Sequence, residues 1–258
     1  MQENALIDVR SVKKDYHVGT VTVKALRGVD LKIEEGEICS IIGRSGSGKS
    51  TLLNVLAGLE KVTAGEIVIA GKHLERMTQG ELILFRQKHI GFIFQSFNLM
   101  PYYTALENVA LPLSFRGVPR ELRMKRAARM LEIVGLETHM KHKPSELSGG
   151  QQQRVGIARA LVTNPQIVFA DEPTGNLDSN TSDEVMRVII DILREQKKTL
   201  IMVTHDPHIA DFGDKIIRLL DGHITDIEIN PKREEYQNEP EIRRSEERRV
   251  GKECRSRW

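Results

Sequence analysis

The stretch IIGRSGSGKSTLLNVLAGLE, residues 41–60, decides the fold of this chain. Its central part GRSGSGKST, residues 43–51, matches the pattern G-x-x-x-x-G-K-[ST]. The apolar run EICSIIG ends in the first glycine of this motif, and leucines at helical spacing follow the motif. Glycines let the backbone curl so that successive N–H groups and the amino terminus of the next helix face phosphate groups. The stretch therefore predicts a phosphate-binding P-loop between a strand and a helix.

The motif assigns chemistry to individual residues. We expect Lys49 to reach the β- and γ-phosphates of a nucleotide and the Ser50 hydroxyl to bind Mg²⁺. The run IVFADE supplies Asp171, which would hold the metal, and Glu172, which would orient or deprotonate the attacking water. Read alone, these two acids could simply close a strand. The other nucleotide contacts expected in the loop are Gly43, Arg44, Ser45, Gly46, Ser47, Gly48 and Thr51.

Strand and helix patterns alternate around the P-loop. Residues 6–12 and 29–33 alternate apolar with polar side chains, which predicts an antiparallel layer. The runs QIVFAD and TLIMVTH read as buried strands on either side of an amphipathic helix, and residues 98–136 are mostly helical in pattern, punctuated by three prolines. We predict an α/β fold of the P-loop NTPase type, with a mainly parallel sheet, an N-terminal antiparallel β layer and a helical insert at about 97–160.

Composition excludes several classes of function. The 258 residues carry a net charge of +2, and the segment from Pro231 onward holds nine basic and seven acidic residues, so the remainder is neutral and no nucleic-acid partner is expected. No apolar run approaches the roughly 18 residues of a bilayer-spanning helix, which favours a cytoplasmic location. Residues 230–258 almost lack aliphatic side chains and are expected to be disordered, and residues 245–258 resemble non-native ends of assembled sequences.

A second glycine-led helix start, ELSGGQQQRVGIARAL, lies at residues 146–161. With the P-loop, the Asp-Glu pair and LSGGQQQR in this order, residues 5–229 resemble the nucleotide-binding subunits of ATP-binding cassette transporters, which have a RecA-like core. LSGGQ is the specific part of the resemblance, because other P-loop families lack it. The resemblance implies a head-to-tail dimer of identical cassettes, in which each signature binds the γ-phosphate held by the other cassette. The signature residues are Ser148, Gly149, Gly150 and Gln151.

Four more residues take roles through this resemblance. Gln95 matches the glutamine that approaches Mg²⁺ and the attacking water, and His205 matches the histidine that contacts the γ-phosphate. Read without it, Gln95 is an ordinary loop amide and His205 a structural histidine. Tyr16 stands where the family stacks an aromatic ring on adenine, but it could equally pack on the antiparallel layer. GNLD, residues 175–178, matches the loop that crosses the dimer interface, with Asp178 as its acid.

The stretch QSFNLMPYYTALENVALPL, residues 95–113, resembles the equivalent stretch in ATPase subunits of lipoprotein-release and macrolide-export systems. In transporters this region forms part of the groove for a helix of the membrane subunit. The resemblance implies an ATPase that uses ATP and Mg²⁺ on the cytoplasmic face of a membrane and partners with an integral membrane permease subunit. The alternative is a cell-division-type ATPase that signals through a membrane partner and transports nothing. DNA-repair and translation cassettes are not expected, because the chain has neither long coiled coils nor two cassettes.

Overall fold

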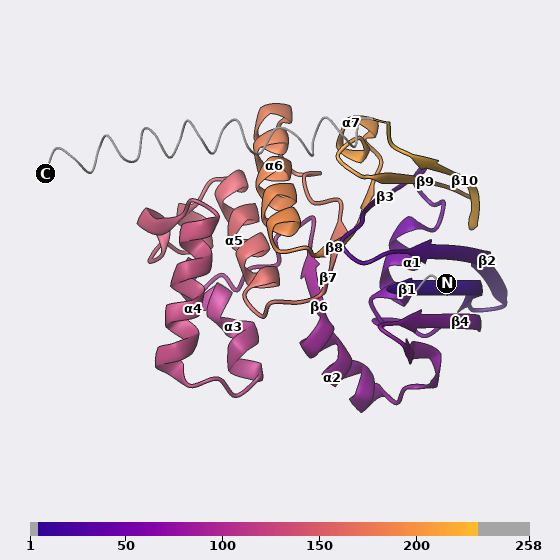
Figure 1. Ribbon diagram of the computed structural model, residues 1–258, viewed down its shortest axis with the longest axis horizontal. Coiled ribbons are helices and arrows are strands. Elements are labelled where there is room, and N and C mark those ends of the chain that lie inside the picture. Colours follow the sequence, from indigo (N-terminus) through magenta and orange to yellow (C-terminus); the bar gives the residue numbers. More distant parts are fainter. Residues whose placement is uncertain (1–4, 232–258) are drawn as a thin grey trace, which may run out of the picture.

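The computed structural model describes residues 5–231, which form two β-sheets and a set of helices (Figure 1). The expected tail at 230–258 lies almost entirely outside the described residues. The strands are β1 (Ile7–Val18), β2 (Val21–Ile33), β3 (Ile38–Ile42), β4 (Ala64–Ile69), β5 (Lys72–His73), β6 (Ile90–Ile93), β7 (Ile167–Asp171), β8 (Thr199–Thr204), β9 (Lys215–Leu220) and β10 (His223–Ile229). The helices are α1 (Lys49–Leu56), α2 (Gln79–His89), α3 (Ala105–Phe115), α4 (Arg120–Ile133), α5 (Gly149–Leu161), α6 (Ser179–Glu195) and α7 (Pro207–Ala210), with short 3₁₀ turns η1 (Leu74–Arg76), η2 (Glu137–His139) and η3 (Pro144–Glu146).

The central sheet has the strand order β10-β9-β3-β8-β7-β6. All its strands run parallel except β10, which pairs antiparallel with β9 at the edge. The strands β3, β7 and β8 are mostly apolar and almost entirely buried, as expected for a parallel sheet that is covered on both faces. In β7, Val168 and Ala170 belong to one hydrophobic cluster, whereas Ile167 and Phe169 belong to the other. This alternation follows from the pleat, because successive side chains of a strand point to opposite faces.

Different elements cover the two faces of the central sheet. Apolar side chains of α3, α4, α5 and α6 share the cluster of Val168. Apolar side chains of α1, α2 and the antiparallel sheet share the cluster of Phe169. Figure 1 shows the same division, with the helices α3, α4 and α5 on one side and the antiparallel strands on the other. The helix after the P-loop and the signature helix therefore pack on opposite faces of one sheet.

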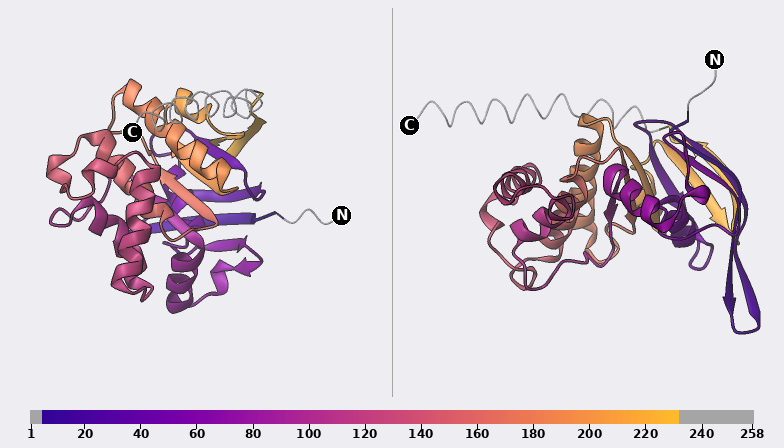
Figure 2. Two further views of the ribbon diagram at one scale, coloured as in Figure 1. Left: turned by 60° about the vertical axis from the view of Figure 1, so that its left-hand side comes forward. Right: turned by 90° about the horizontal axis from the view of Figure 1, so that it is seen from below.

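The antiparallel layer has the strand order β2-β1-β4-β5 and is larger than expected. The sequence pattern predicted strands at 6–12 and 29–33, but β1 and β2 form one long hairpin whose ends project beyond the rest of the sheet (Figure 2). The pattern fails in the projecting part because both faces are open to solvent there. Val18, Val21 and Val23 are all exposed, so no buried face imposes an alternation.

The predicted helical region contains α3 and α4, which pack against α5. Thr104 begins α3 with a capping box, since its hydroxyl accepts from Glu107 N and its own N–H donates to the Glu107 carboxylate. Pro112 was expected to punctuate this region but lies inside α3, so that expectation was wrong. Pro112 lies in the last turn of α3, which ends three residues later at Phe115. The backbone N–H that proline lacks therefore interrupts only the end of the helix. The insert boundaries at 97 and 160 stay a prediction.

Within residues 5–231, no helix has both the length and the apolar character that crossing a bilayer would require.

Candidate functional site

The P-loop curls between the end of β3 and the start of α1. Gly46 has φ +80° and Gly48 has φ +102°. Residues with a Cβ rarely adopt this left-handed backbone conformation, because it is strained for them. A Cβ at Gly48 would also lie 2.6 Å from the carbonyl oxygen of Ala25. Gly48 is the N-cap of α1, and no side chain caps this helix. The first N–H groups of α1 are therefore left for a ligand, and an anion suits them.

Lys49 points its ammonium group back into the P-loop. Its side chain donates to the carbonyl oxygens of Gly43 at 2.8 Å and Arg44 at 3.1 Å. The residue is only 7% exposed. A buried ammonium is costly unless it is hydrogen-bonded or paired with an anion. The loop thus holds a cation where the terminal phosphates of a nucleotide would lie.

Ser50 and Asp171 bring a hydroxyl and a carboxylate together beside the P-loop. Ser50 Oγ donates to Asp171 Oδ1 at 3.4 Å. Burial is the largest cause that raises the pKa of Asp171, and the negative charge of Glu172 acts in the same direction. A bound cation would offset both effects, and oxygen ligands of these two kinds are those that Mg²⁺ prefers. The pair fits the predicted metal.

Glu172, Gln95 and His205 converge from the loops that follow β7, β6 and β8. His205 Nδ1 donates to Glu172 Oε2 at 3.0 Å, and Gln95 Nε2 donates to the same oxygen at 3.5 Å. Glu172 has φ +43°, a conformation that residues other than glycine rarely adopt and that clusters at functional sites. The three predicted catalytic residues are brought together because the carboxyl ends of parallel strands meet at one edge of a sheet.

A cleft of about 670 Å³ lies over the P-loop. Its wall includes many predicted residues, namely Ser45, Gly46, Gly48, Lys49, Ser50, Thr51, Glu172 and His205. Three of the contacts predicted in the P-loop are not among its lining residues: Gly43, Arg44 and Ser47. These three act through their carbonyl groups, which accept hydrogen bonds from Lys49 and from the N–H of Gly222. They shape the loop from behind.

Part of the cleft wall lies outside the sequence motifs. It comprises Val23, Lys24, Ala25 and Arg27 of β2 and the turn of Asp221 and Gly222 between β9 and β10. Gly222 N donates to Ser47 O at 3.0 Å, and Arg27 N donates to Gly222 O at 2.9 Å. The turn therefore joins the P-loop to β2. An Asp-Gly pair between apolar runs is a strong hairpin signal and could have revealed it.

Tyr16 lies on β1, next to the cleft rather than in its wall. Its hydroxyl donates to Glu60 Oε2 at 2.6 Å, and Lys14 Nζ lies 4.9 Å from the ring centroid. Burial and the hydrogen bond to Glu60 raise the pKa of Tyr16. Its partner across the hairpin is Val23, which does line the cleft. Its contact with adenine stays a prediction.

The signature begins α5 with a complete capping box. Ser148 Oγ accepts from Gln151 N at 3.3 Å, and Gln151 Oε1 accepts from Ser148 N at 2.9 Å. Gly150 packs so closely on α6 that a Cβ would lie 2.6 Å from Thr181 Cγ2, and Gly149 faces Leu177. None of the four signature residues lines the cleft over the P-loop. They lie on the other face of the central sheet, as their helix does.

Local hydrogen bonds order the start of α6, and another bond ties the signature helix to the loop after β7. Asp178 caps α6, because its carboxylate accepts from Thr181 N at 3.0 Å and Thr181 Oγ1 at 2.7 Å, and these bonds lower the pKa of Asp178. Gln153 is fully buried in α5 and donates to the carbonyl of Pro173, directly after Glu172. No sequence motif predicted a role for Gln153. Its place among three consecutive glutamines gave no signal that one of them is buried.

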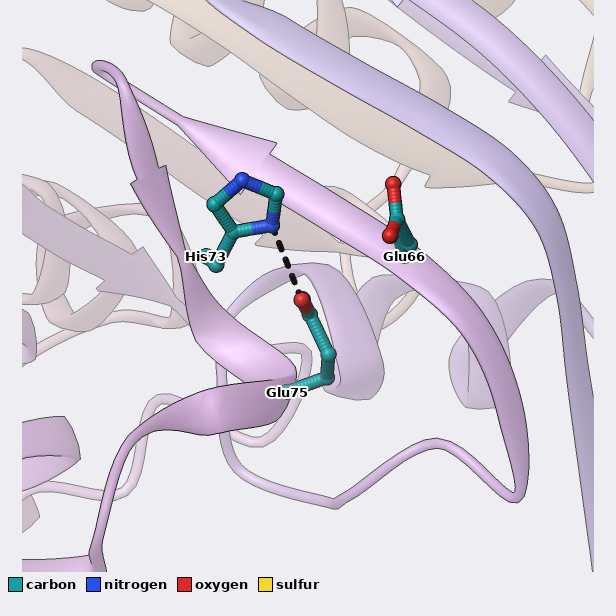
Figure 3. Close-up of side chains that lie close together, drawn as sticks. All are labelled: Glu66, His73 and Glu75. Carbon is teal, nitrogen blue, oxygen red and sulfur yellow. Dashed lines mark hydrogen bonds and ion pairs between the residues drawn. The ribbon is translucent and has the colours of Figure 1, made fainter.

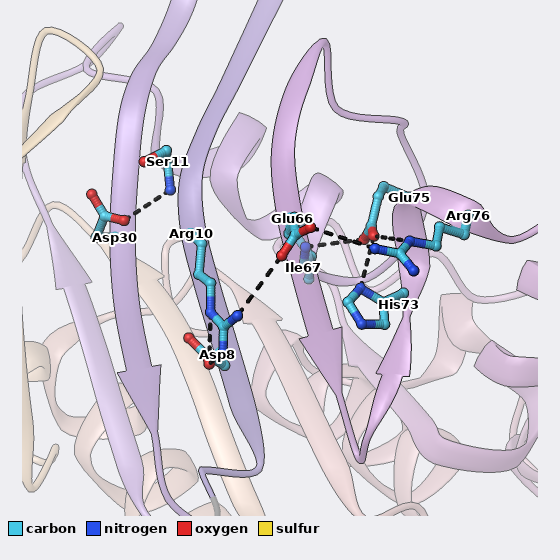
Figure 4. Close-up of polar contacts among 9 residues, drawn as sticks. All are labelled: Asp8, Arg10, Ser11, Asp30, Glu66, Ile67, His73, Glu75 and Arg76. Carbon is cyan, nitrogen blue, oxygen red and sulfur yellow. Dashed lines mark hydrogen bonds and ion pairs between the residues drawn. The ribbon is translucent and has the colours of Figure 1, made fainter.

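One group of side chains outside the cleft has spacing that could hold a metal ion: Glu66, His73 and Glu75 (Figure 3). His73 Nδ1 donates to Glu75 Oε1 at 2.9 Å. Arg76 lies 3.3 Å from Glu75 and 3.5 Å from Glu66, and Arg10 also reaches Glu66 at 3.8 Å (Figure 4). The guanidinium groups already neutralise the carboxylates, so this network joins β1, β4 and η1 without a metal.

The P-loop, the hydroxyl and carboxylate of Ser50 and Asp171 and the carboxylate of Glu172 are features of a nucleoside triphosphate hydrolase of the P-loop class. The chain belongs to the ABC transporter family, whose model matches residues 26–175. It is an ATP-binding, ATP-hydrolysing cassette that uses Mg²⁺, and the predicted fold class is confirmed.

Relatives and solved structures agree with this assignment. An uncharacterized ABC transporter ATP-binding protein of Thermotoga maritima is 49% identical over 223 residues, which cover 86% of this chain and 95% of that protein. The macrolide export ATP-binding/permease protein MacB of Syntrophobacter fumaroxidans is 46% identical, and the match covers 85% of this chain but 31% of MacB.

A solved structure of MJ0796, described as a dimeric bacterial ABC transporter cassette, matches with a TM-score of 0.80 and 47% identity over 86% of this chain and 98% of that chain. Another structure of the same cassette, described as a dimeric post-hydrolysis state bound to ADP and Pi, matches with a TM-score of 0.79 and 46% identity over the same shares. A protein named MJ0796 in Methanocaldococcus jannaschii is 48% identical over 223 residues, which cover 85% of this chain and 95% of that protein.

Proposed function

We propose that the chain powers an export-type or lipoprotein-release-type transporter as half of an ATP-closed dimer of cassettes. The observation that carries this proposal is the placement of α1 and α5 on opposite faces of the central sheet. Each helix has a glycine-led amino terminus that suits a phosphate group, but one chain cannot bring both to the same phosphate. A second copy, packed head to tail, would supply the missing signature. The dimeric structures of the related cassette MJ0796 support this arrangement.

The residues divide the work in this proposed site. Lys49 and the P-loop N–H groups bind the terminal phosphates, and Ser148 of the opposite subunit binds the γ-phosphate. Glu172 orients or deprotonates the attacking water, while His205 holds the Glu172 carboxylate in place. Ser50, Asp171 and Gln95 would hold Mg²⁺, which neutralises phosphate charge when it is bound. Other roles are proposed with them: Tyr16 stacks on adenine and Asp178 lies at the dimer interface.

The membrane partner is proposed to dock on residues 95–113. Met100, Tyr102 and Tyr103 are exposed there, in the segment that precedes α3. Exposed apolar and aromatic side chains of this kind suit a helix-in-groove contact. The MacB relatives are named ATP-binding/permease proteins, and this chain spans about a third of their length. We infer a separate or fused permease as partner, which places the cassette on the cytoplasmic face of a membrane. The proposed cassette is residues 5–229, with its helical subdomain at about 97–160.

Light scattering with ATP tests the two-chain site. Glu172→Gln removes the carboxylate but keeps its shape, so hydrolysis should fall about a hundredfold or more and the ATP-bound dimer should accumulate. Adding Ser148→Arg places a bulky cation in the interface and should prevent the dimer while each P-loop still binds nucleotide. Ser145→Arg, on an exposed residue just before the signature, is the matched control and should leave the dimer intact. A Glu172→Gln protein that stays monomeric, or a double variant that dimerises equally well, would contradict the proposal.

A further inference from the structure

A chain of hydrogen bonds leads from the signature to a histidine in the 3₁₀ turn η2. The Gln151 side-chain amide accepts from Ser148 N through Oε1 at 2.9 Å. Its nitrogen Nε2 lies 3.2 Å from His139 Nε2, and His139 Nδ1 lies 2.9 Å from Thr138 Oγ1. His139 is partly buried, and its ring lies 5.1 Å from that of His142. The signature is therefore hydrogen-bonded to a residue outside the LSGGQ motif, His139.

The polarity of this chain follows from its first bond. A backbone N–H can only donate, so the oxygen of the Gln151 amide must face Ser148, and the NH₂ group must face His139. His139 Nε2 must then accept, which requires it to be without a proton. The proton of the neutral ring sits on Nδ1, where it can donate to Thr138 Oγ1. One tautomer of one histidine satisfies every bond.

We propose that His139 is a positioning residue for the signature: its unprotonated Nε2 holds the Gln151 amide and thereby keeps Ser148 capped. The proposal rests on the proposed function, in which Ser148 binds the γ-phosphate of the opposite subunit. Without this acceptor the Gln151 amide is free to turn, and a turned amide would aim its NH₂ group at the Ser148 N–H. Two N–H donors cannot bond to each other, so the Ser148 backbone would lose its bond to the Gln151 amide. Only the bond from Gln151 N would then hold the Ser148 hydroxyl in its direction.

Three variants separate the hydrogen bond from the shape of the ring, each in the Glu172→Gln protein. His139→Phe keeps a ring but removes the acceptor, and should raise the ATP concentration needed for dimerisation about fivefold, as expected for a lost helix cap. His139→Gln offers an amide oxygen near the position of Nε2 and should restore most of the affinity. His142→Phe changes the neighbouring ring without touching the Gln151 amide and is the control. ATP binding by the monomer should be the same in all three.

Nuclear magnetic resonance of the ring nitrogens tests the bond without a dimer. Long-range ¹H–¹⁵N spectra of the nucleotide-free chain, above neutral pH, should show His139 with its proton on Nδ1. A proton on Nε2, or a folded His139→Phe protein that dimerises as well as its parent, would overturn the inference. If the Glu172→Gln parent itself fails to dimerise, the proposed function fails instead, and the spectrum alone decides whether His139 holds the amide.

Discussion

The two helix starts to which we assign phosphate contacts are built in opposite ways. The P-loop helix α1 begins at Gly48, in a left-handed conformation and with no side-chain cap. The signature helix α5 begins at Ser148, in an extended conformation and with a capping box that satisfies donors at both ends. The first N–H groups of α1 have no side-chain partner, so they are open to a ligand. At the start of α5, the side chains of Ser148 and Gln151 accept hydrogen bonds from the backbone N–H groups.

This difference suits the P-loop to nucleotide binding within one chain and the signature to contact with a nucleotide held by another chain. Lys49 donates to carbonyl groups of its own loop, and nucleotide phosphates would replace those contacts. The capping box between Ser148 and Gln151 already orders the signature. In the proposed dimer, the signature could therefore bind a phosphate held by the other subunit without the cost of ordering its own backbone first. We therefore expect substitutions in the P-loop to act mainly on nucleotide binding and turnover, and substitutions in the signature to act on helix stability and dimer closure.

The largest effect is expected for Lys49→Ala. Removing the ammonium leaves the terminal phosphates without their fixed cation, so ATP turnover should fall about a thousandfold and nucleotide binding should weaken. Phosphate release and fluorescence titration with a nucleotide analogue measure the two quantities. Lys125→Ala, which removes an exposed cation on α4, is the control. Turnover that survives in purified Lys49→Ala would show that the cleft over the P-loop is not the catalytic site.

A smaller effect, on folding, is expected for Gly48→Ala. The new Cβ would meet the Ala25 carbonyl in a left-handed conformation, which should lower the free energy of unfolding by about 2–4 kcal/mol. Gly46→Ala is the matched control: φ is also positive, but a Cβ there would meet nothing within 4 Å, so the cost should be about 1–2 kcal/mol. Urea unfolding compares them. Equal costs would mean that close approach to Ala25 does not shape the loop.

Loss of a cap should distinguish the two helices more finely. Ser148→Ala opens the capping box of α5 and should lower the free energy of unfolding by about 1 kcal/mol. Ser50→Ala, in the first turn of the uncapped α1, should change it by less than about 0.5 kcal/mol while weakening Mg²⁺-dependent ATP binding. Thermal unfolding without nucleotide measures both. If Ser50→Ala is the more destabilising of the two, the comparison between the helix starts is wrong.

The smallest expected effect has the opposite sign. Because burial raises the pKa of Asp171, its ionised form is less favourable in the folded chain than in the unfolded chain. That cost is present above the folded pKa and disappears as the pH falls through it. Asp171→Asn should therefore raise the Tm of the nucleotide-free protein by about a degree or two at pH 7, with a smaller gain at lower pH. The same variant should lose the extra stabilisation by Mg²⁺ and ATP. A lowered Tm would contradict the assignment of Asp171 as a strained metal ligand.

The sequence predicted those parts of the fold in which local pattern and burial agree. The P-loop, β3, β7, β8 and α6 were all expected, because strands covered on both faces are apolar throughout and α6 has one apolar face. Part of the site followed as well, since β7 ends at Asp171, directly before Glu172, and Asp171 accepts a hydrogen bond from Ser50 beside the P-loop. The resemblance added Gln95 and His205, whose side chains contact Glu172, while the roles that it implies for them stay predictions.

The rest depended on contacts that are distant in sequence. The helix α2 went unnoticed although Thr78 and Glu81 form a capping box, because its apolar face is narrow and only Leu82 and Phe85 are buried. The bond between Gln151 and His139 spans 12 positions and joins two residues that no motif pairs. The walls of the cleft that β2 and the Asp221 turn provide are also set by tertiary contacts, which periodicity does not encode.

The turn of Asp221 and Gly222 has a consequence for the order in which the chain becomes competent during synthesis. It closes the cleft by bonding to Ser47 and Arg27, yet the ribosome makes it roughly 170 residues after the P-loop, about 10–35 s later at 5–20 residues per second. A nascent chain that has already exposed its P-loop lacks this wall. ATP should therefore bind tightly only once the last strands have emerged, which delays energy consumption until the cassette is complete.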